Sequence, residues 1–161
     1  MDWLDQRSIP DLDPRAERAL RAAGQDFSND ALAEHWLTQA ASLAPEHPAV
    51  LLAFYRYHLY KHRYPEAEVF ARQLLAQSTA ELGLPSVLMD TQPAHADFSA
   101  MEPQIRFWLY GMQALGWVVI RDGRLDEGKA LMRKVVELDP SDQTKTKVLL
   151  DVIENAGLAS D

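Results

Sequence analysis

Apolar residues recur at helical spacing along most of the chain, and turn residues separate the resulting segments. Asp13-Pro14, an N-cap acid followed by proline, predicts a helix that runs to Ala23 and ends at Gly24. The same reading predicts further helices at about 28–44, 48–62, 64–82, 103–121, 126–138 and 142–156. No segment shows the convincing period-two alternation of a strand. The pattern therefore predicts an all-α protein of about seven helices.

The segment 84–102 interrupts this pattern, because it contains two prolines and has no sustained period. It is either a long ordered loop or a flexible insertion, and loops of this length are often functional. Its apolar side chains include Val87, Met89 and Phe98. Because such an exposed apolar surface would be a liability, we expect the segment to fold over a binding groove or to contact a partner.

The final helix is expected to begin at Ser141 or Asp142 and to end at Gly157. Its inward stripe is predicted to consist of Val148, Leu149, Val152 and Ile153. A polar outer side would allow this helix to cap the end of the protein.

The stretch Gly123–Pro140, GRLDEGKALMRKVVELDP, contains a turn glycine, a charged helix opening and a closing proline. It resembles the second helix of a tetratricopeptide repeat together with the turn before it. In that helix the repeat pattern has a small residue, a bulky residue, another small residue and then a proline at fixed offsets. Two sets of residues in this chain match these offsets: Gly128, Met132, Val135 and Pro140, and Ala33, Leu37, Ala40 and Pro45. Ala67, Ala71 and Leu74 match a third time, with Thr79 in place of the proline, and Leu115-Gly116 matches the close crossing of a first helix.

The resemblance implies a right-handed solenoid of antiparallel helix-turn-helix repeats, in one domain covering 1–161. The repeats would span about 14–47, 48–81 and 109–142, with an insertion at about 82–108 and a capping helix at about 142–156. Each helix pair would bury its apolar face only against its neighbours. Packing as an ordinary four-helix bundle is the alternative.

The resemblance also implies that first helices line a concave surface that binds extended peptides or helices. The residues carried over to that surface are Leu52, Arg56, Leu59, Tyr60, Tyr110, Gln113, Trp117, Ile120 and Arg121. Aromatic anchors with arginines are the usual composition of an interaction hot spot. The alternative is that Trp117 and Ile120 are core residues beneath the 84–102 segment. The family's clamp for C-terminal carboxylates is not indicated, because Leu52 and Gln113 replace its lysine and asparagine.

The net charge of −8, from 24 acidic and 16 basic residues, argues against a nucleic-acid or anionic-membrane binder. The chain has no cysteine, which excludes disulfides and thiolate metal sites and fits a reducing cytosol. The N-terminus lacks a signal-peptide pattern, and the most apolar stretch, 50–60, is too short to span a bilayer. We therefore expect a cytoplasmic protein.

No catalytic or cofactor-binding motif is recognisable, so we expect neither an enzyme nor a cofactor. His58 and His62 have the spacing that places two imidazoles on one helical face, where they could share a zinc ion. No third ligand lies at a suitable spacing, so no metal site is predicted.

These observations predict a non-enzymatic protein-binding module, an adaptor or chaperone-like scaffold, whose partner is another protein. A small bacterial secretion chaperone is an alternative, because such proteins resemble this chain in length, acidity and three-repeat layout; the insertion departs from them. A third reading is a self-associating structural protein, such as a homodimer, that uses the 84–102 segment and the region around Trp3.

Overall fold

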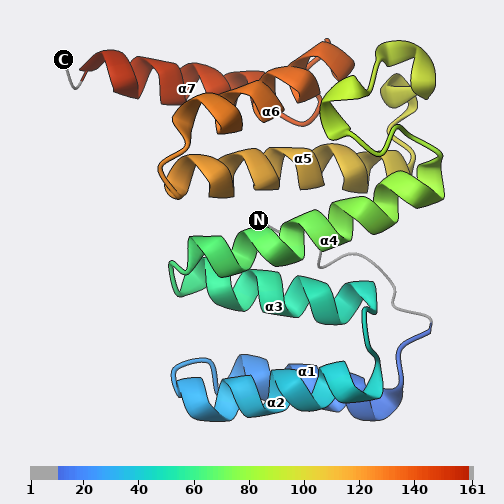
Figure 1. The fold of residues 1–161 in the computed structure, drawn as a ribbon, viewed down its shortest axis with the longest axis vertical. Helices are drawn as coiled ribbons and strands as arrows, with labels where there is room; N and C mark the ends of the chain where they lie inside the picture. Colours follow the sequence, from blue (N-terminus) through green and yellow to red (C-terminus); the bar gives the residue numbers. More distant parts are fainter. Residues whose placement is uncertain (1–10, 160–161) are drawn as a thin grey trace. The chain divides into compact units, whose positions relative to one another are not determined.

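The computed structural model describes the backbone of residues 11–159 and the side chains of residues 11–156. Within that range the protein is entirely helical, with seven α-helices and no strand, which confirms the all-α prediction (Figure 1). The helices are α1 (Pro14–Gln25), α2 (Asp30–Leu43), α3 (Pro48–Tyr60), α4 (Tyr64–Leu82), α5 (Pro103–Arg121), α6 (Leu125–Leu138) and α7 (Thr146–Ala159). Trp3, the residue invoked for self-association, lies outside the described residues.

The chain divides into two compact units, Met1–Leu74 and Leu75–Asp161, where the sequence predicts one domain. The division falls inside α4, whose first part belongs to unit 1 and whose last turns belong to unit 2. Each unit has its own packing and is described by itself.

Side chains that precede the helices fix where the helices of unit 1 begin. Asp13 caps α1 by accepting a hydrogen bond of 2.8 Å from the backbone N–H of Arg15, and Pro14 occupies the first turn. Asn29 caps α2 in the same way, accepting from the N–H of Leu32 at 3.2 Å. The predicted stop at Gly24 is wrong, because Gly24 is still helical and α1 continues to Gln25, two residues past the predicted last residue Ala23.

Small residues allow α1, α2 and α3 to pack closely in unit 1. One core cluster joins Ala16 and Ala19 of α1 to Ala40 of α2 and Val50 of α3, all at most 4% exposed. A second cluster joins Ala23, Ala33, Leu37 and Tyr57. Alanine faces bring helix axes close together, so this core depends on fit more than on large side chains.

Unit 2 is organised around the antiparallel pair α5 and α6, which lie side by side (Figure 1). The two helices cross at Gly116 and Gly128. A Cβ added to Gly128 would lie 2.6 Å from the carbonyl oxygen of Gly116, and one added to Gly116 would lie 3.0 Å from the carbonyl oxygen of Gly128. Only glycine at both positions permits this distance between the backbones.

The 84–102 segment forms three short 3-10 turns, η1 (Leu88–Asp90), η2 (Pro93–His95) and η3 (Phe98–Ala100). It lies beside the N-terminal end of α5 and the C-terminal end of α6 (Figure 1). Phe98, 3% exposed, packs against Trp108 with ring centroids 6.0 Å apart. Of the two readings of this segment, the structure therefore favours an ordered loop packed within unit 2.

The last helix differs from its prediction in both its start and its inward face. The carboxylate of Asp139 accepts hydrogen bonds from the backbone N–H groups of Gln143 and Thr144, so these residues form a turn and α7 begins only at Thr146. It also extends past Gly157, the predicted stop, to Ala159.

The buried positions of α7 are Thr146 and Leu150, which are 0% and 7% exposed, and the predicted inward residues Leu149 and Ile153 are partly buried. The prediction that Val148 and Val152 face inward is wrong, because these side chains are 54% and 59% exposed. Thr146 and Leu150 lie four residues apart and share one face of α7, whereas Val148 lies two residues from each and therefore on the far side of the helix.

Candidate protein-binding surfaces

The four predicted contact residues of unit 1 share one stripe of α3. Leu52, Arg56 and Leu59 are partly exposed and Tyr60 is 55% exposed. The opposite side of the helix buries Val50, Leu51, Tyr55 and Tyr57. The α3 stripe is thus a mixed apolar and cationic surface that ends in an exposed phenol.

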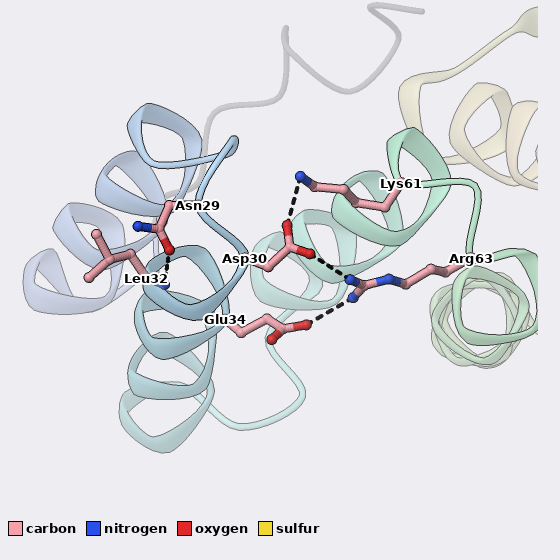
Figure 2. Close-up of polar contacts among 6 residues, drawn as sticks. All are labelled: Asn29, Asp30, Leu32, Glu34, Lys61 and Arg63. Carbon is pink, nitrogen blue, oxygen red and sulfur yellow. Dashed lines mark hydrogen bonds and ion pairs between the residues drawn. The ribbon is translucent and has the colours of Figure 1, made fainter.

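A group of charged side chains lies next to the end of this stripe and joins the start of α2 to the α3–α4 turn (Figure 2). The two carboxylate oxygens of Asp30 pair with Nζ of Lys61 at 2.8 Å and with Nη2 of Arg63 at 2.9 Å. Nη1 of Arg63 also pairs with Oε1 of Glu34 at 2.8 Å. The hydrogen bond from Lys61 is the main reason that the pKa of Asp30 lies below its usual value.

The same cations contact aromatic rings. Nζ of Lys61 lies 4.2 Å from the ring centre of Phe27, and the guanidinium carbon of Arg63 lies 5.5 Å from that of Tyr57. Phe27 in turn meets the edge of Tyr60 at a centroid distance of 6.3 Å. This group ties one helical hairpin of unit 1 to the next, and its cations are already neutralised by Asp30 and Glu34, so it is poorly suited to bind an anion.

Sequence reasoning did not identify this group. The available signals were the acids at the first turn of α2 and the basic residues Lys61 and Arg63 in the turn after α3. No local sequence pattern predicts a contact between residues more than thirty positions apart along the chain, as Asp30 and Arg63 are.

His58 lies in an aromatic stack that connects α3 to α4 in unit 1. Its ring is nearly parallel to those of Phe54 and Phe70, at centroid distances of 6.5 and 5.7 Å. Its Nδ1 is buried without a hydrogen-bond partner. Burial, followed by the nearby positive charge of Arg63, lowers the pKa of His58 below its ordinary value of 6.5.

The zinc spacing considered for His58 and His62 does not produce a shared helical face. The helix α3 ends at Tyr60, and His62 has a positive φ of 60° in the following turn, where its Nδ1 lies 3.1 Å from the hydroxyl of Tyr64. Among the residues that the structure describes, no group of three or more potential metal ligands is present.

The predicted contact residues of unit 2 lie on α5 and divide into exposed and buried members. Tyr110, Trp117 and Ile120 are partly exposed, and Arg121 is exposed. Gln113 is only 6% exposed, and its amide Nε2 donates to the carbonyl of Thr144 and to the hydroxyl of Thr146. The amide of Gln113 is therefore used inside the unit, where it holds the start of α7 against α5.

Two arginines extend over the aromatic rings of α5. The guanidinium carbon of Arg121 lies 5.8 Å from the ring centre of Trp117, and that of Arg106 lies 5.7 Å from the ring of Tyr110. Arg106 was not among the predicted contacts. Its position four residues before Tyr110, on the same helix face, was the signal that could have indicated it.

The 84–102 segment is attached to the part of unit 2 near the first turns of α5. Besides the Phe98–Trp108 contact, Nζ of Lys134 donates to the carbonyl of Thr91 at 2.9 Å, and the amide of Gln143 donates to the carbonyl of Ser99 at 3.3 Å. Trp117 lies more than two helical turns beyond Trp108 on α5. Val87 and Met89 of the segment remain 58% and 41% exposed.

Comparisons with known proteins place the chain beside one relative of similar length. It is 34% identical over 153 residues to the "Uncharacterized 19.8 kDa protein in nifW 5'region" of Azotobacter chroococcum mcd 1. The match covers 94% of this chain and 82% of the relative. The chain belongs to the same family as that protein. The similarity runs through both compact units.

Two further comparisons gave no match. No family model matches the chain. No solved structure matches it either. Within the described part of the chain, none of the helices has the length and apolar character needed to cross a membrane.

Proposed function

We propose that this protein is a cytoplasmic, non-enzymatic scaffold of tetratricopeptide-like helical repeats that binds another protein. The proposed contacts are the α3 stripe (Leu52, Arg56, Leu59 and Tyr60) and the open side of α5 (Tyr110, Trp117, Ile120 and Arg121). Gln113 is left out of this set because its side chain is occupied within unit 2.

The repeat assignment is supported by the burial of the small residues that define its frame. Ala33 and Ala40 are 0% exposed in α2, and Ala67 is 0% exposed in α4. In the last repeat the corresponding small residue is Gly128, which permits the close crossing with Gly116. Small residues at these offsets are what a repeat of packed helical hairpins requires.

The single observation that carries the binding proposal is the aromatic and cationic surface of α5. Trp117 is partly exposed near the C-terminal end of α5, a helix that buries residues on most of its other sides, and Arg121 lies over its ring. Partly exposed tryptophan and arginine on a rigid helix form the typical centre of a protein-binding hot spot.

The proposal is tested by affinity capture with the double variant Trp117→Ala/Arg121→Ala. The variant is expected to lose a partner that the wild-type protein retains, with an unchanged helical circular dichroism spectrum. Arg133→Ala is the matched control, because Arg133 is an exposed arginine on α6 that pairs with Glu154 of α7 and is not among the proposed contacts. Undiminished capture by a folded double variant would contradict the proposal for α5.

If the double variant fails to fold, Tyr60→Ala provides an independent test, because Tyr60 is 55% exposed and lies on the α3 stripe. The name of the Azotobacter relative places that protein in the 5' region of nifW. We therefore propose the products of the genes adjacent to the one that encodes this chain as the first purified partners to test.

Self-association is the second candidate function, and exposed valines favour it. Val148 and Val152 lie one turn apart on α7 and are more than half exposed, and Val87 of the 84–102 segment is 58% exposed. Sedimentation velocity of the pure protein distinguishes the two functions. A stable dimer that Val148→Ser/Val152→Ser dissociates would favour self-association, whereas a monomer at all concentrations would exclude it.

A further inference from the structure

The outer face of the last helix combines two valines with two charges of opposite sign. Val148 and Val152 lie one turn apart on α7 and are 54% and 59% exposed. Lys147 and Asp151, the residues immediately before them, are exposed as well. Because the two pairs repeat after four residues, all four side chains lie within about 140° of the helix circumference. They form one open surface, the α7 stripe.

The opposite face of α7 attaches the helix to its own unit. The helix packs against α6 (Figure 1), and the buried residues Thr146 and Leu150 lie about 160° around the axis from Val148. The outer side of a terminal helix in a repeat protein is normally polar, because no further helix covers it. The valines of the α7 stripe depart from that rule, so this face is suited to contact with another molecule.

The two charges of the stripe are available for such a contact. Neither Lys147 nor Asp151 forms an ion pair with another residue in the described part of the chain, whereas Glu154 of the same helix pairs with Arg133. A lysine four residues before an acid is also the weaker orientation for an ion pair within one helix. Both charges can therefore pair with groups of a second molecule.

The α7 stripe is complementary to itself. When two copies of a helix pack antiparallel about a two-fold axis, the same flank of each helix faces the other, and every contact occurs twice. One register then pairs Lys147 of each copy with Asp151 of the other. In that register the four valines of the two helices lie at successive levels about 3 Å apart along the axis and form an apolar seam beside the ion pairs.

We propose that a second copy of this chain binds the α7 stripe as an antiparallel, two-fold symmetric helix pair. The charges select this occupant, because a parallel pair in register would place Lys147 against Lys147 and Asp151 against Asp151. This inference rests on the second candidate function, self-association, and specifies its surface and geometry. Because a single pair of helices buries a small area, the dimer is expected to be weak and dependent on concentration.

Charge reversal tests the predicted ion pairs in sedimentation velocity experiments on the full-length chain at low salt. Lys147→Asp and Asp151→Lys each place like charges against each other at both pairs, so each is expected to weaken the dimer at least about 10-fold. An equimolar mixture of the two variants restores opposite charges at both pairs and should dimerise like the wild-type protein. The double variant Lys147→Asp/Asp151→Lys should do the same. Asp126→Lys on α6 is the matched control, because it makes the same change in net charge as Asp151→Lys outside the stripe.

Single cysteines test the direction and register of the two helices, because the chain has no cysteine of its own. In the proposed register the two copies of residue 148 are offset by about 3 Å along the axis and the two copies of residue 152 by about 9 Å. A disulfide requires Cα atoms within about 7 Å of each other. Mild oxidation should therefore link Val148→Cys into a covalent dimer and leave Val152→Cys monomeric, whereas a parallel pair in register would link both.

The outcomes separate this geometry from self-association itself, with circular dichroism confirming that each variant is folded. A wild-type protein that stays monomeric at all concentrations excludes self-association and this inference together, and leaves the scaffold proposal untouched. A dimer that Val148→Ser/Val152→Ser dissociates but neither charge reversal weakens keeps self-association and overturns the antiparallel register. A dimer that none of these variants alters uses another surface, and the inference is wrong.

Discussion

Replacement of Gly128 by alanine should separate α5 from α6 and destabilise unit 2. The added Cβ would lie 2.6 Å from the carbonyl oxygen of Gly116 and 2.4 Å from Cγ1 of Ile120. Favourable contacts between such atoms are near 3.5 Å. The isoleucine side chain can rotate away, but the carbonyl belongs to the backbone of α5, so the two helices must move apart.

The magnitude follows from two opposing effects. Overpacking of this kind costs about 1–3 kcal/mol, and a clash with backbone belongs at the upper end of that range. Alanine in place of glycine within a helix returns about 1 kcal/mol through its higher helix propensity. We therefore expect a net loss of about 2 kcal/mol in the free energy of unfolding, or about a 30-fold increase in the unfolding equilibrium constant.

Urea unfolding followed by far-UV circular dichroism measures this change, with two other glycines as controls. Gly111→Ala meets only the side-chain end of Leu75, at 3.0 Å, so its effect should be close to zero. Gly24→Ala meets nothing within 4 Å in α1 and should stabilise its unit by about 0.5–1 kcal/mol. The reasoning is refuted if Gly128→Ala is as stabilising as Gly24→Ala.

Three further predictions concern polar groups. Because burial lowers the pKa of His58, this histidine binds a proton more readily in the unfolded chain than in the folded one. The free energy of unfolding of unit 1 should therefore fall as the pH drops below about 6.5 towards the lowered pKa. Urea titrations at several pH values should show that His58→Phe removes this pH-dependent fall in stability. The pKa of Asp30 is lowered by its cationic partners, so its contribution is present above about pH 4 and lost as the pH falls through the lowered value. Asp30→Asn should therefore reduce stability at pH 7 more than at pH 3, and an equal effect at both would contradict the ion-pair account. Thr79→Val should cost about 1–3 kcal/mol, because it removes the 3.0 Å hydrogen bond to the buried indole N–H of Trp108; a neutral result in thermal unfolding would show that the indole finds another partner.

Most helix positions could be predicted because their signals are local. Asp13 caps α1 as predicted, and Asn29 caps α2 through its contact with a backbone N–H three residues ahead. The helices 64–82 and 103–121 have the predicted bounds, because proline near their starts and glycine just past their ends restrict the backbone dihedral angles locally. The final helix was placed less well, because Asp139 holds the turn after α6 through contacts that no local pattern encodes.

The candidate surfaces were predictable only as helix faces. The resemblance to tetratricopeptide repeats placed Tyr60, Trp117 and Arg121 on an open surface; Tyr60 and Arg121 are exposed, and Trp117, for which a core position was the alternative, is partly exposed. The same reasoning misjudged Gln113, since its burial depends on Thr144 and Thr146, which lie more than thirty residues away. Periodicity misjudged the exposed valines of α7, because apolar residues lie on more than one face of this helix and its packing against α6 and α5 selects the face that is buried.

By itself the sequence determined the all-α class, the order of the helices and the glycine and alanine positions at which they approach one another. These properties depend on backbone preferences and on side-chain volume, which act over a few residues. Only the tertiary structure decided which polar groups are used within each unit, such as Asp30 with Lys61 and Arg63, and which remain at the surface of α5. Long-range pairing decides these outcomes, because a side chain's partners are set by the packing of distant helices and not by its neighbours along the chain.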